Sequence, residues 1–467
     1  MNLTRFGPVP CRPDWLRIGL SGSLALLLLG MAATAQAAPA SGHWVESWGQ
    51  AMVSHVQPSP DRDGAREDAY AAPHLRDATL RQTVPLSVGG QRLRVRLSNV
   101  YGSTPLTLTA ASVAPAADVD GDHTAIDPAR RHALHFDGKP MLTLPAGATA
   151  LSDPITLALP ALSRVVVSLY FHDDTAIADY HAAQTTTTTA LVAGNALAAT
   201  SLASRPPLAA LDKDAASHIY VLEGVEVEAA QPTRVIVAFG DSITDGAYAT
   251  GPDKTWPGVL ATRANRAAAP GAAVINAGIS GNELTSDQSY LPFGPAALKR
   301  FERDVIDRAG VTDVIVLLGT NDLNRGIDAA GQPRGAAAHD IIDSLRLLAD
   351  AAHAHHLRIH AGTIPPFAGF TAEGWYSPAT EAKRQSVNRW MRHAGVFDSV
   401  LDFSSALAGP YQPSKPAAQQ PSLPEGMAQV CAGDTGLHPN DRGYAVMGTL
   451  AYNVLFHAQE QPAARCH

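Results

Sequence analysis

The feature that most constrains the fold is an alternation of short apolar runs with longer helical stretches, which begins near Thr233. Residues 235–239 read Val-Ile-Val-Ala-Phe and are followed at once by Gly-Asp-Ser. A run that is apolar at every position is typical of a strand buried on both faces. Further strands are expected at 274–275, 314–318, 357–363 and 400–403, and helices at 256–266, 295–308, 337–356, 379–393 and 441–457. This alternation predicts a parallel α/β sheet covered on both faces.

The first half of the chain has a different pattern. Residues 92–97 alternate strictly between arginine and an apolar residue, which is the period of a half-buried strand. Other strands are expected at 80–88, 106–113, 141–144, 155–159 and 165–171, whereas 185–189 is either a strand or a polar linker. Many of the 38 glycines and 34 prolines fall between these runs and indicate turns. We therefore predict a β-sandwich, jelly-roll-like, over residues 38–230, and an α/β domain over 231–467.

The N-terminus has the pattern of a secretory signal. Arg5, Arg12 and Arg17 form a basic start, residues 18–33 are mostly apolar, and residues 35–37 read Ala-Gln-Ala. A basic start, an apolar run and a small-x-small site predict a cleaved signal peptide over residues 1–37. The alternative is an uncleaved membrane anchor, but the run is short for a span. We expect an exported protein, periplasmic or extracellular, with no stable membrane span after cleavage.

Charge and cysteine usage agree with export. The signal segment carries three arginines and one aspartate, so its removal takes the formal net charge from −8 to −10. An acidic chain is a poor candidate for binding nucleic acid, which needs clustered Lys and Arg. Cys431 and Cys466 remain after cleavage, and two cysteines can form a disulfide in an oxidising compartment. The alternative is two unrelated free thiols.

Three expected strands of the second half each end in a residue able to take part in acyl transfer. Ser242 follows the first strand, Gly281 lies in a glycine-rich turn after the second, and Asn321 follows the third. A serine at the carboxyl edge of such a sheet can be a nucleophile if a base lies within reach. A glycine N–H and an asparagine amide can donate to an oxyanion. Taken singly, each has an ordinary interpretation as a helix cap or a turn.

Near the C-terminus, residues 434–440 read Asp-Thr-Gly-Leu-His-Pro-Asn before the last expected helix. A histidine on a short loop, here His438, with an acid upstream, here Asp434, suits a base and the group that orients it. The alternative is a surface histidine, which most of the 18 histidines must be.

The four segments together resemble the SGNH, or GDSL, hydrolase family. They appear as Gly-Asp-Ser-Ile-Thr (240–244), Asn-Ala-Gly-Ile-Ser-Gly-Asn (276–282), Gly-Thr-Asn-Asp (319–322) and Leu-His-Pro-Asn-Asp (437–441). The resemblance covers residues 234–458 and implies a flavodoxin-like sheet with Ser242 as nucleophile and His438 as general base. It implies an oxyanion hole made by the Ser242 N–H, the Gly281 N–H and the Asn321 amide.

One position departs from the family pattern. The family usually has its acid three residues before the histidine, where this chain has Thr435, whereas Asp434 lies four before. We predict that a one-residue bulge brings Asp434 to His438. The alternative is a Ser-His pair whose ring is oriented by a backbone carbonyl.

The resemblance implies an esterase that needs no cofactor. No metal-binding motif, P-loop or GxGxxG is present. The first half is similar to β-domains of some exported SGNH proteins, around residues 44–48 and 96–102. We expect the substrate to be a small-molecule or polysaccharide ester, with an O-acyl carbohydrate favoured. A lipase or arylesterase, and a noncatalytic carbohydrate-binding protein on a hydrolase scaffold, are the alternatives.

Overall fold

The computed structural model describes residues 42–55, 72–117, 119, 121–182, 188–208, 218–266, 271–287, 293–324, 335–367, 370, 376–408 and 436–461. These residues all belong to one compact unit, Ser41–His467. We call residues 42–229 the β-rich part and residues 234–461 the α/β part. The domain boundary at 230/231 stays a prediction, and the expected signal segment, 1–37, lies outside the described residues.

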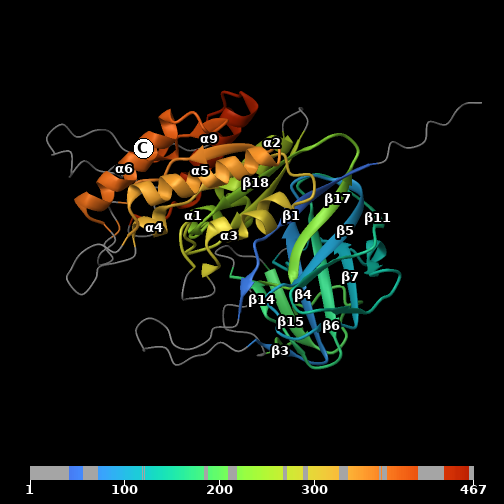
Figure 1. Ribbon diagram of the computed structural model, residues 1–467. Coiled ribbons are helices and arrows are strands. Elements are labelled where there is room, and N and C mark those ends of the chain that lie inside the picture. The colour runs from blue at the N-terminus through green and yellow to red at the C-terminus, as the bar shows by residue number, and fades with distance from the viewer. Residues whose placement is uncertain are drawn as a thin grey trace, which may run out of the picture. The chain divides into compact units, whose positions relative to one another are not determined.

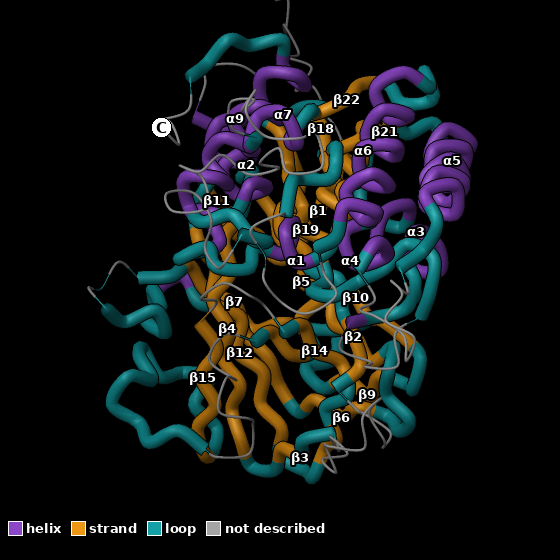
Figure 2. The backbone as a smooth tube through the Cα atoms, turned by 90° about the vertical axis from the view of Figure 1, so that its left-hand side faces the viewer, coloured by secondary structure: helices purple, strands orange, loops and turns teal. Residues whose placement is uncertain are grey.

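A five-stranded parallel sheet forms the centre of the α/β part (Figure 2). Its strands are β18 (Arg234–Gly240), β19 (Ala272–Gly278), β20 (Asp313–Leu317), β21 (Arg358–Gly362) and β22 (Ser399–Leu401). The order across the sheet is β19-β18-β20-β21-β22, which is the flavodoxin-like order. The predicted α/β fold with a parallel sheet is confirmed. In this order β18 lies at the switch point, where ligands bind beyond the carboxyl ends of the strands.

The apolar run of β18 is buried on both faces, as its sequence predicts. Ile236 and Ala238 pack into a cluster with α2 (Trp256–Arg266) and α9 (Asp441–Phe456). Val235, Val237 and Phe239, which alternate with them, belong to the main core together with residues of α3 (Ala297–Phe301) and α5 (Ala338–Ala354). Helices therefore lie on both sides of the sheet (Figure 1). The remaining long helix is α6 (Pro378–His393).

The helix expected over 295–308 is divided. After α3, residues Glu302–Ile306 form a π-helical turn, η5, in which the Asp307 N–H donates to the Glu302 carbonyl. The wider turn is accompanied by an unusual ion cluster. The Asp304 carboxylate lies 3.0 Å from Arg300 Nη1, 2.7 Å from Arg303 Nε and 3.7 Å from Arg308 Nη2. The prediction of a single regular helix over 295–308 was therefore wrong.

The β-rich part contains two antiparallel sheets of five strands. The first holds β1 (His43–Gly49), β17 (Leu222–Ala229), β5 (Gly90–Asn99), β10 (Ala148–Leu151) and β11 (Ile155–Leu159). The second holds β15 (Thr188–Ala193), β4 (Ala78–Pro85), β12 (Arg164–Phe171), β7 (Ala110–Pro115) and β8 (His132–Leu134). Side chains of both sheets, such as Val95 and Val167, share one buried cluster. The predicted β-rich half is confirmed, and the jelly-roll connection of its strands stays a prediction.

Several strands of this part differ from the expectation. Residues 106–113 form two strands, because β6 (Leu106–Leu108) pairs with β9 (Leu142–Leu144) while β7 pairs with β12. β15 begins at Thr188, and 183–187 lie outside the described residues. β1 and β17 were not predicted, because each carries glutamates that interrupt the apolar pattern. Glu46 and Glu226 are both fully buried.

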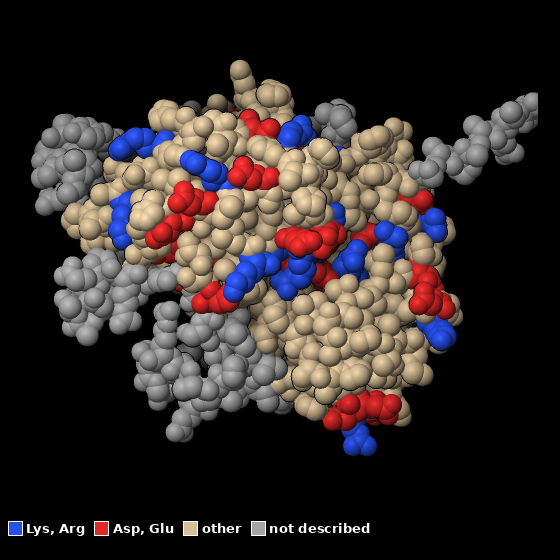
Figure 3. Space-filling model, viewed as in Figure 1, with Lys and Arg blue, Asp and Glu red and all other residues tan. Residues whose placement is uncertain are grey.

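The two parts meet along β1 and the edge strand β19. Gln50, just after β1, forms a parallel bridge with Asn276 of β19, and the Glu46 N–H donates to the Ala309 carbonyl at 3.0 Å. Buried Arg308 donates to Glu46 Oε1 at 2.9 Å and to the Gln50 carbonyl at 3.0 Å. In the view of Figure 3, basic and acidic side chains alternate in a band across the middle of the face.

No helix among the described residues is long and apolar enough to cross a bilayer.

Candidate active site

Ser242 begins the short helix α1 (Ser242–Asp245) directly beyond β18. The turn before it needs glycine, because a Cβ on Gly240 would lie 2.8 Å from the Leu317 carbonyl and 2.0 Å from Thr244 Oγ1. Asp241 caps the helix by accepting a hydrogen bond from the Ile243 N–H at 3.0 Å. The Ser242 N–H has no acceptor among the described residues. It is therefore available to a ligand at the edge of the sheet.

His438 lies two residues before Asn440, the N-cap of α9. Its Nε2 is 2.8 Å from Ser242 Oγ, across 196 positions of sequence. The structure thus brings together the two residues predicted as nucleophile and base. A hydroxyl within this distance of an imidazole nitrogen can transfer its proton directly.

Gly281 and Asn321 lie beyond the two strands next to β18. Gly281 has a φ of +77°, and a Cβ there would meet the Phe293 ring at 2.4 Å, so only glycine fits the turn. Among the described residues its N–H has no acceptor. Asn321, in α4 (Thr320–Leu323), donates from Nδ2 to the Asn282 carbonyl at 3.0 Å. That bond uses one of the two amide hydrogens, and the other is left for a ligand.

Two buried charged groups hold these turns in place. The Asp322 carboxylate accepts from the N–H groups of Leu284 and Thr285, both at 3.0 Å. Arg300 donates to the Gly240 carbonyl at 2.9 Å and to the Ala277 carbonyl at 3.0 Å. Arg300 also donates to Asn282 Oδ1 at 3.0 Å. The ends of β18 and β19 and the Gly281 turn are thereby fixed to one guanidinium.

Tyr248 is a residue of the site that the sequence did not indicate. Its ring stacks on His438, with the centroids 5.6 Å apart and the planes at 28°, and the residue is 55% exposed. Its φ is +67°, which is unusual for a bulky residue and costs on the order of 1–2 kcal/mol. The loop is held by Tyr444, whose hydroxyl donates to the Ala247 carbonyl at 2.8 Å. The surrounding structure therefore holds the exposed ring beside His438 in spite of this strain.

Asp434, Cys431 and Cys466 lie outside the described residues. Asp441, the acid that follows His438 most closely, accepts from the N–H of Thr250 at 2.9 Å and from its Oγ1 at 2.6 Å. It joins the start of α9 to the loop that carries Tyr248.

Asp241 has the most perturbed acidity at the site. Burial raises the pKa of its carboxyl from the ordinary value of 3.8 to about 7, against the opposing effects of the Ile243 N–H and the charge of His438. Its Oδ2 has no hydrogen-bond partner among the described residues. The side chain is therefore largely protonated in mildly acidic solution, although it lies next to the nucleophile in sequence.

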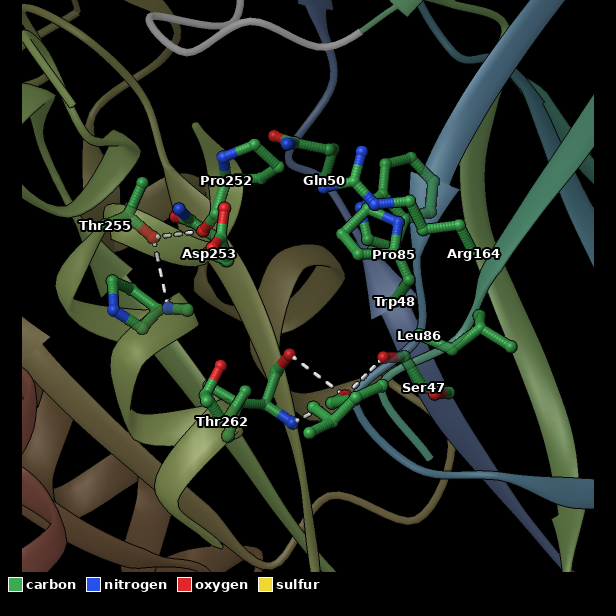
Figure 4. Close-up of a pocket in the computed structure, with 18 of the residues that line it drawn as sticks. Ser47, Trp48, Gln50, Pro85, Leu86, Arg164, Pro252, Asp253, Thr255 and Thr262 are labelled. Atoms are coloured by element: carbon green, nitrogen blue, oxygen red, sulfur yellow. Dashed lines mark hydrogen bonds between the residues drawn. The ribbon is translucent and has the colours of Figure 1, made fainter. Parts of the chain in front are cut away.

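A hollow of about 240 Å³ lies where the two parts meet (Figure 4), and its lining includes Asp245 of α1 but neither Ser242 nor His438. Trp48, Gln50 and Pro85 line it from the β-rich part, and Pro252 and Thr255 from the α/β part. It is smaller than the roughly 300–1,000 Å³ of pockets for drug-sized ligands. Within the described ranges, no group of three or more His, Cys, Asp or Glu side chains could hold a metal ion.

Residues 238–446 match the model of the GDSL-like lipase/acylhydrolase family. No curated protein matches the chain. A lipase/acylhydrolase from Enterococcus faecalis is similar at 19% identity and a TM-score of 0.36, over 49% of this chain and 100% of its own. An aryl esterase from M. smegmatis is similar at 16% identity and a TM-score of 0.36, over 49% of this chain and 100% of its own. A carbohydrate acetylesterase from Sinorhizobium meliloti is similar at 14% identity and a TM-score of 0.34, over 48% of this chain and 99% of its own.

The acidity of Asp241 predicts a pH effect on stability. The folded-state pKa lies above the unfolded one, so the folded state binds the proton more tightly, and this contribution is lost as the pH rises from about 4 to about 7. Asp241→Asn keeps a cap acceptor and cannot ionise. The free energy of unfolding of the parent minus that of the variant should fall by up to a few kcal/mol across this range and stay level above it.

Urea unfolding at a series of pH values measures this difference. Asp287→Asn is the matched control, because the Ala296 N–H and Lys299 lower the pKa of Asp287. For this variant the free energy of unfolding of the parent minus that of the variant should rise slightly with pH. A parent-minus-variant difference for Asp241 that is constant from pH 4 to pH 8 would contradict the assignment.

Proposed function

Residues 238–446 of this chain belong to the GDSL-like lipase/acylhydrolase family, and from that premise we propose that the protein is a secreted serine esterase that removes O-acetyl or other short acyl groups from carbohydrates. The ester-hydrolase class follows from the family. The observation that carries the mechanism is the contact of 2.8 Å between Ser242 Oγ and His438 Nε2 at the carboxyl edge of the sheet. A noncatalytic binding protein would have no need of this contact.

The reaction is acyl transfer to water in two stages. Ser242 Oγ attacks the ester carbonyl carbon while His438 Nε2 takes the hydroxyl proton. The carbonyl oxygen becomes an oxyanion. When the carbonyl forms again, the bond from its carbon to the alcohol oxygen breaks, and the alcohol leaves with the proton from His438. Water then attacks the carbonyl carbon of the acyl-enzyme while His438 Nε2 takes a proton from that water. When the second oxyanion returns to a carbonyl, Ser242 Oγ leaves with the proton from His438, and the carboxylic acid is released.

The oxyanion is stabilised by three donors in this proposal. They are the Ser242 N–H, the Gly281 N–H and the remaining amide hydrogen of Asn321. Support comes from the first two having no acceptor among the described residues, and from the bond that holds the Asn321 amide to the Asn282 carbonyl. Donors that are fixed before the reaction need no reorganisation when the charge develops.

For the group that orients His438 we propose Asp434, four residues upstream. Asp441 is a weaker candidate, because both of its carboxylate oxygens already accept hydrogen bonds from Thr250. If neither carboxylate acts, a backbone carbonyl orients the ring and the enzyme works with a Ser-His pair.

The carbohydrate ester is supported by the surroundings of the base. The leaving alcohol must approach His438 Nε2 to receive its proton, so the group beside the imidazole forms a wall of the alcohol subsite. That group is the exposed ring of Tyr248. A flat aromatic face suits a ring-shaped alcohol, such as a sugar, better than a linear one. An aryl ester shares this chemistry, and a lipid ester is the alternative that the substrate series below distinguishes.

Export and a disulfide between Cys431 and Cys466 complete the proposal. Both rest on sequence alone, because the signal segment and the two cysteines lie outside the described residues. N-terminal sequencing of the secreted protein should begin at Ala38, and thiol titration of the denatured protein before and after reduction should show two thiols only after reduction.

The nucleophile and base give the first activity prediction. Ser242→Ala and His438→Ala should each lower kcat for p-nitrophenyl acetate by a factor on the order of 10⁴ or more, and the double variant should be no worse than either single one. Ser163→Ala is the control, since the only partner of that exposed hydroxyl among the described residues is the Pro160 carbonyl. Activity of Ser242→Ala within tenfold of the parent would refute the assignment of the nucleophile.

The acid is tested by a matched pair of variants. Asp434→Asn should lower kcat by at least about tenfold, because the imidazolium loses its partner. Asp441→Asn should change kcat by less than about threefold, because its partner is Thr250. Steady-state kinetics on p-nitrophenyl acetate at pH 8 measures both. Equal losses, or no loss in either variant, would contradict the choice of Asp434.

The alcohol subsite predicts a substrate-dependent effect of Tyr248. Tyr248→Ala should lower kcat/KM by about tenfold for an acetylated xylo-oligosaccharide and by about twofold for ethyl acetate, because a stacking contact is worth about 0.5–1.5 kcal/mol. Tyr248→Phe keeps the ring and should retain both activities. Equal changes on the two substrates would remove Tyr248 from the subsite. A parent enzyme that prefers p-nitrophenyl octanoate to every sugar acetate would replace the carbohydrate ester by the lipid ester.

A further inference from the structure

A buried histidine of the β-rich part contacts the helix that begins with Ser242. His181 ends β14 (Asp179–His181) and is 1% exposed. Its Nδ1 lies 2.8 Å from the Ala51 carbonyl oxygen, and its Nε2 lies 3.1 Å from Oδ1 of Asp245, which is 4% exposed. The contact between His181 and Asp245 therefore links the β-rich part to α1, the short helix that begins with Ser242.

The partners of His181 define its protonation. A carbonyl oxygen can only accept, so Nδ1 carries a hydrogen, and Nε2 faces a carboxylate that also accepts. The ring therefore carries both hydrogens and forms an ion pair with Asp245. Burial alone would lower the pKa of His181, but the charge of Asp245 and the hydrogen bonds to Asp245 and Ala51 outweigh it and raise the pKa.

The second oxygen of Asp245 faces the Gly281 turn. Asp245 Oδ2 accepts a hydrogen bond from Ser280 Oγ at 2.8 Å. Ser280 immediately precedes Gly281, whose N–H is one of the proposed oxyanion donors. The backbones of Gly278 and Asp245 also lie close together, since a Cβ on Gly278 would be 2.2 Å from the backbone nitrogen of Asp245. Asp245 thus fixes the turn that carries one donor relative to the helix that carries the nucleophile.

We infer that His181 is a positioning residue for catalysis: through Asp245 and Ser280 it holds the Gly281 N–H at the distance from Ser242 that the transition state requires. The inference rests on the proposed function. It makes the β-rich part a component of the catalytic unit. Asp245 without His181 would be a buried carboxylate with no cation beside it, and would no longer hold a defined position.

The expected kinetic result is a loss of kcat at nearly constant KM, because an oxyanion donor acts mainly in the transition state. Ser280→Ala breaks the last link and leaves the His181–Asp245 pair in place. His181→Gln removes the charge and leaves one donor for Asp245. Each should lower kcat for p-nitrophenyl acetate by about 10- to 100-fold, as expected for a displaced donor. KM should stay within about twofold, and Ser280→Thr, which keeps the hydroxyl, should restore most of kcat.

The double variant separates positioning from general stabilisation. If the three residues act as one chain, Ser280→Ala with His181→Gln should be no worse than the poorer single variant. The affinity for a boronic acid that forms a tetrahedral adduct on Ser242 should fall by the same factor as kcat/KM. His360→Gln is the matched control. It breaks a second buried His-Asp pair, His360 Nε2 to Asp313 Oδ1 at 3.0 Å, near the amino ends of the strands, and should lower the melting temperature while leaving kcat within twofold.

The outcomes are separable from those for the proposed function. Failure of the proposed function appears as hydrolysis that survives Ser242→Ala. The positioning role is overturned if hydrolysis depends on Ser242 but Ser280→Ala and His181→Gln keep kcat within twofold of the parent. It is also overturned if their losses multiply in the double variant or appear in KM alone. Should His181→Gln fail to fold, as judged by circular dichroism, Ser280→Ala and its Thr counterpart decide the question by the same criteria.

Discussion

The buried guanidinium of Arg300 is the interaction on which the rest of the site depends. It is fully desolvated, and burial lowers its pKa to about 10, opposed by the charge of Asp304. Its N–H groups donate to the carbonyls of Gly240 and Ala277 and to the side chain of Asn282, and its Cζ lies 4.1 Å from the centroid of the Phe239 ring. Arg300 thus fixes Gly240, the end of β19 and the Gly281 turn relative to one another. A site that must position a nucleophile and oxyanion donors from different strands requires such a common reference.

A series of ion pairs and hydrogen bonds leads from Arg300 to the β-rich part. Asp304 pairs with Arg303, which donates to the Tyr101 hydroxyl at 2.9 Å and to the Met52 carbonyl at 3.2 Å. A buried network of this kind contributes less to stability than apolar residues of the same volume would. Its value lies in geometry, because each charge can be satisfied only when both parts are in register. Arg300, through Asp304 and Arg303, and the His181–Asp245 pair therefore form two connections between the β-rich part and the edge of the sheet that carries Ser242.

Much of the α/β part could be predicted from the sequence, because its strands are apolar at every position and its helices alternate with them. The order Ser, Gly, Asn, His likewise predicted the pairing of Ser242 with His438. The β-rich part was less accessible: β1 and β17 carry buried glutamates whose counter-charges, such as Arg94 and Arg96 on Glu226 and Arg308 on Glu46, come from distant positions. Tyr248 and His181 gave no local signal, since a tyrosine in a left-handed conformation and a histidine facing two acceptors are defined only by their neighbours.

The most direct test of the account is a crystal structure of the enzyme after reaction with a small organophosphonate that mimics the tetrahedral intermediate. We expect phosphorus to be bonded to Ser242 Oγ, with the phosphoryl oxygen accepting hydrogen bonds from the Ser242 N–H, the Gly281 N–H and the Asn321 amide at about 2.7–3.1 Å. His438 Nε2 should face the oxygen in the leaving-group position. An adduct on another residue, or a phosphoryl oxygen turned away from Gly281 and Asn321 toward solvent, would contradict it.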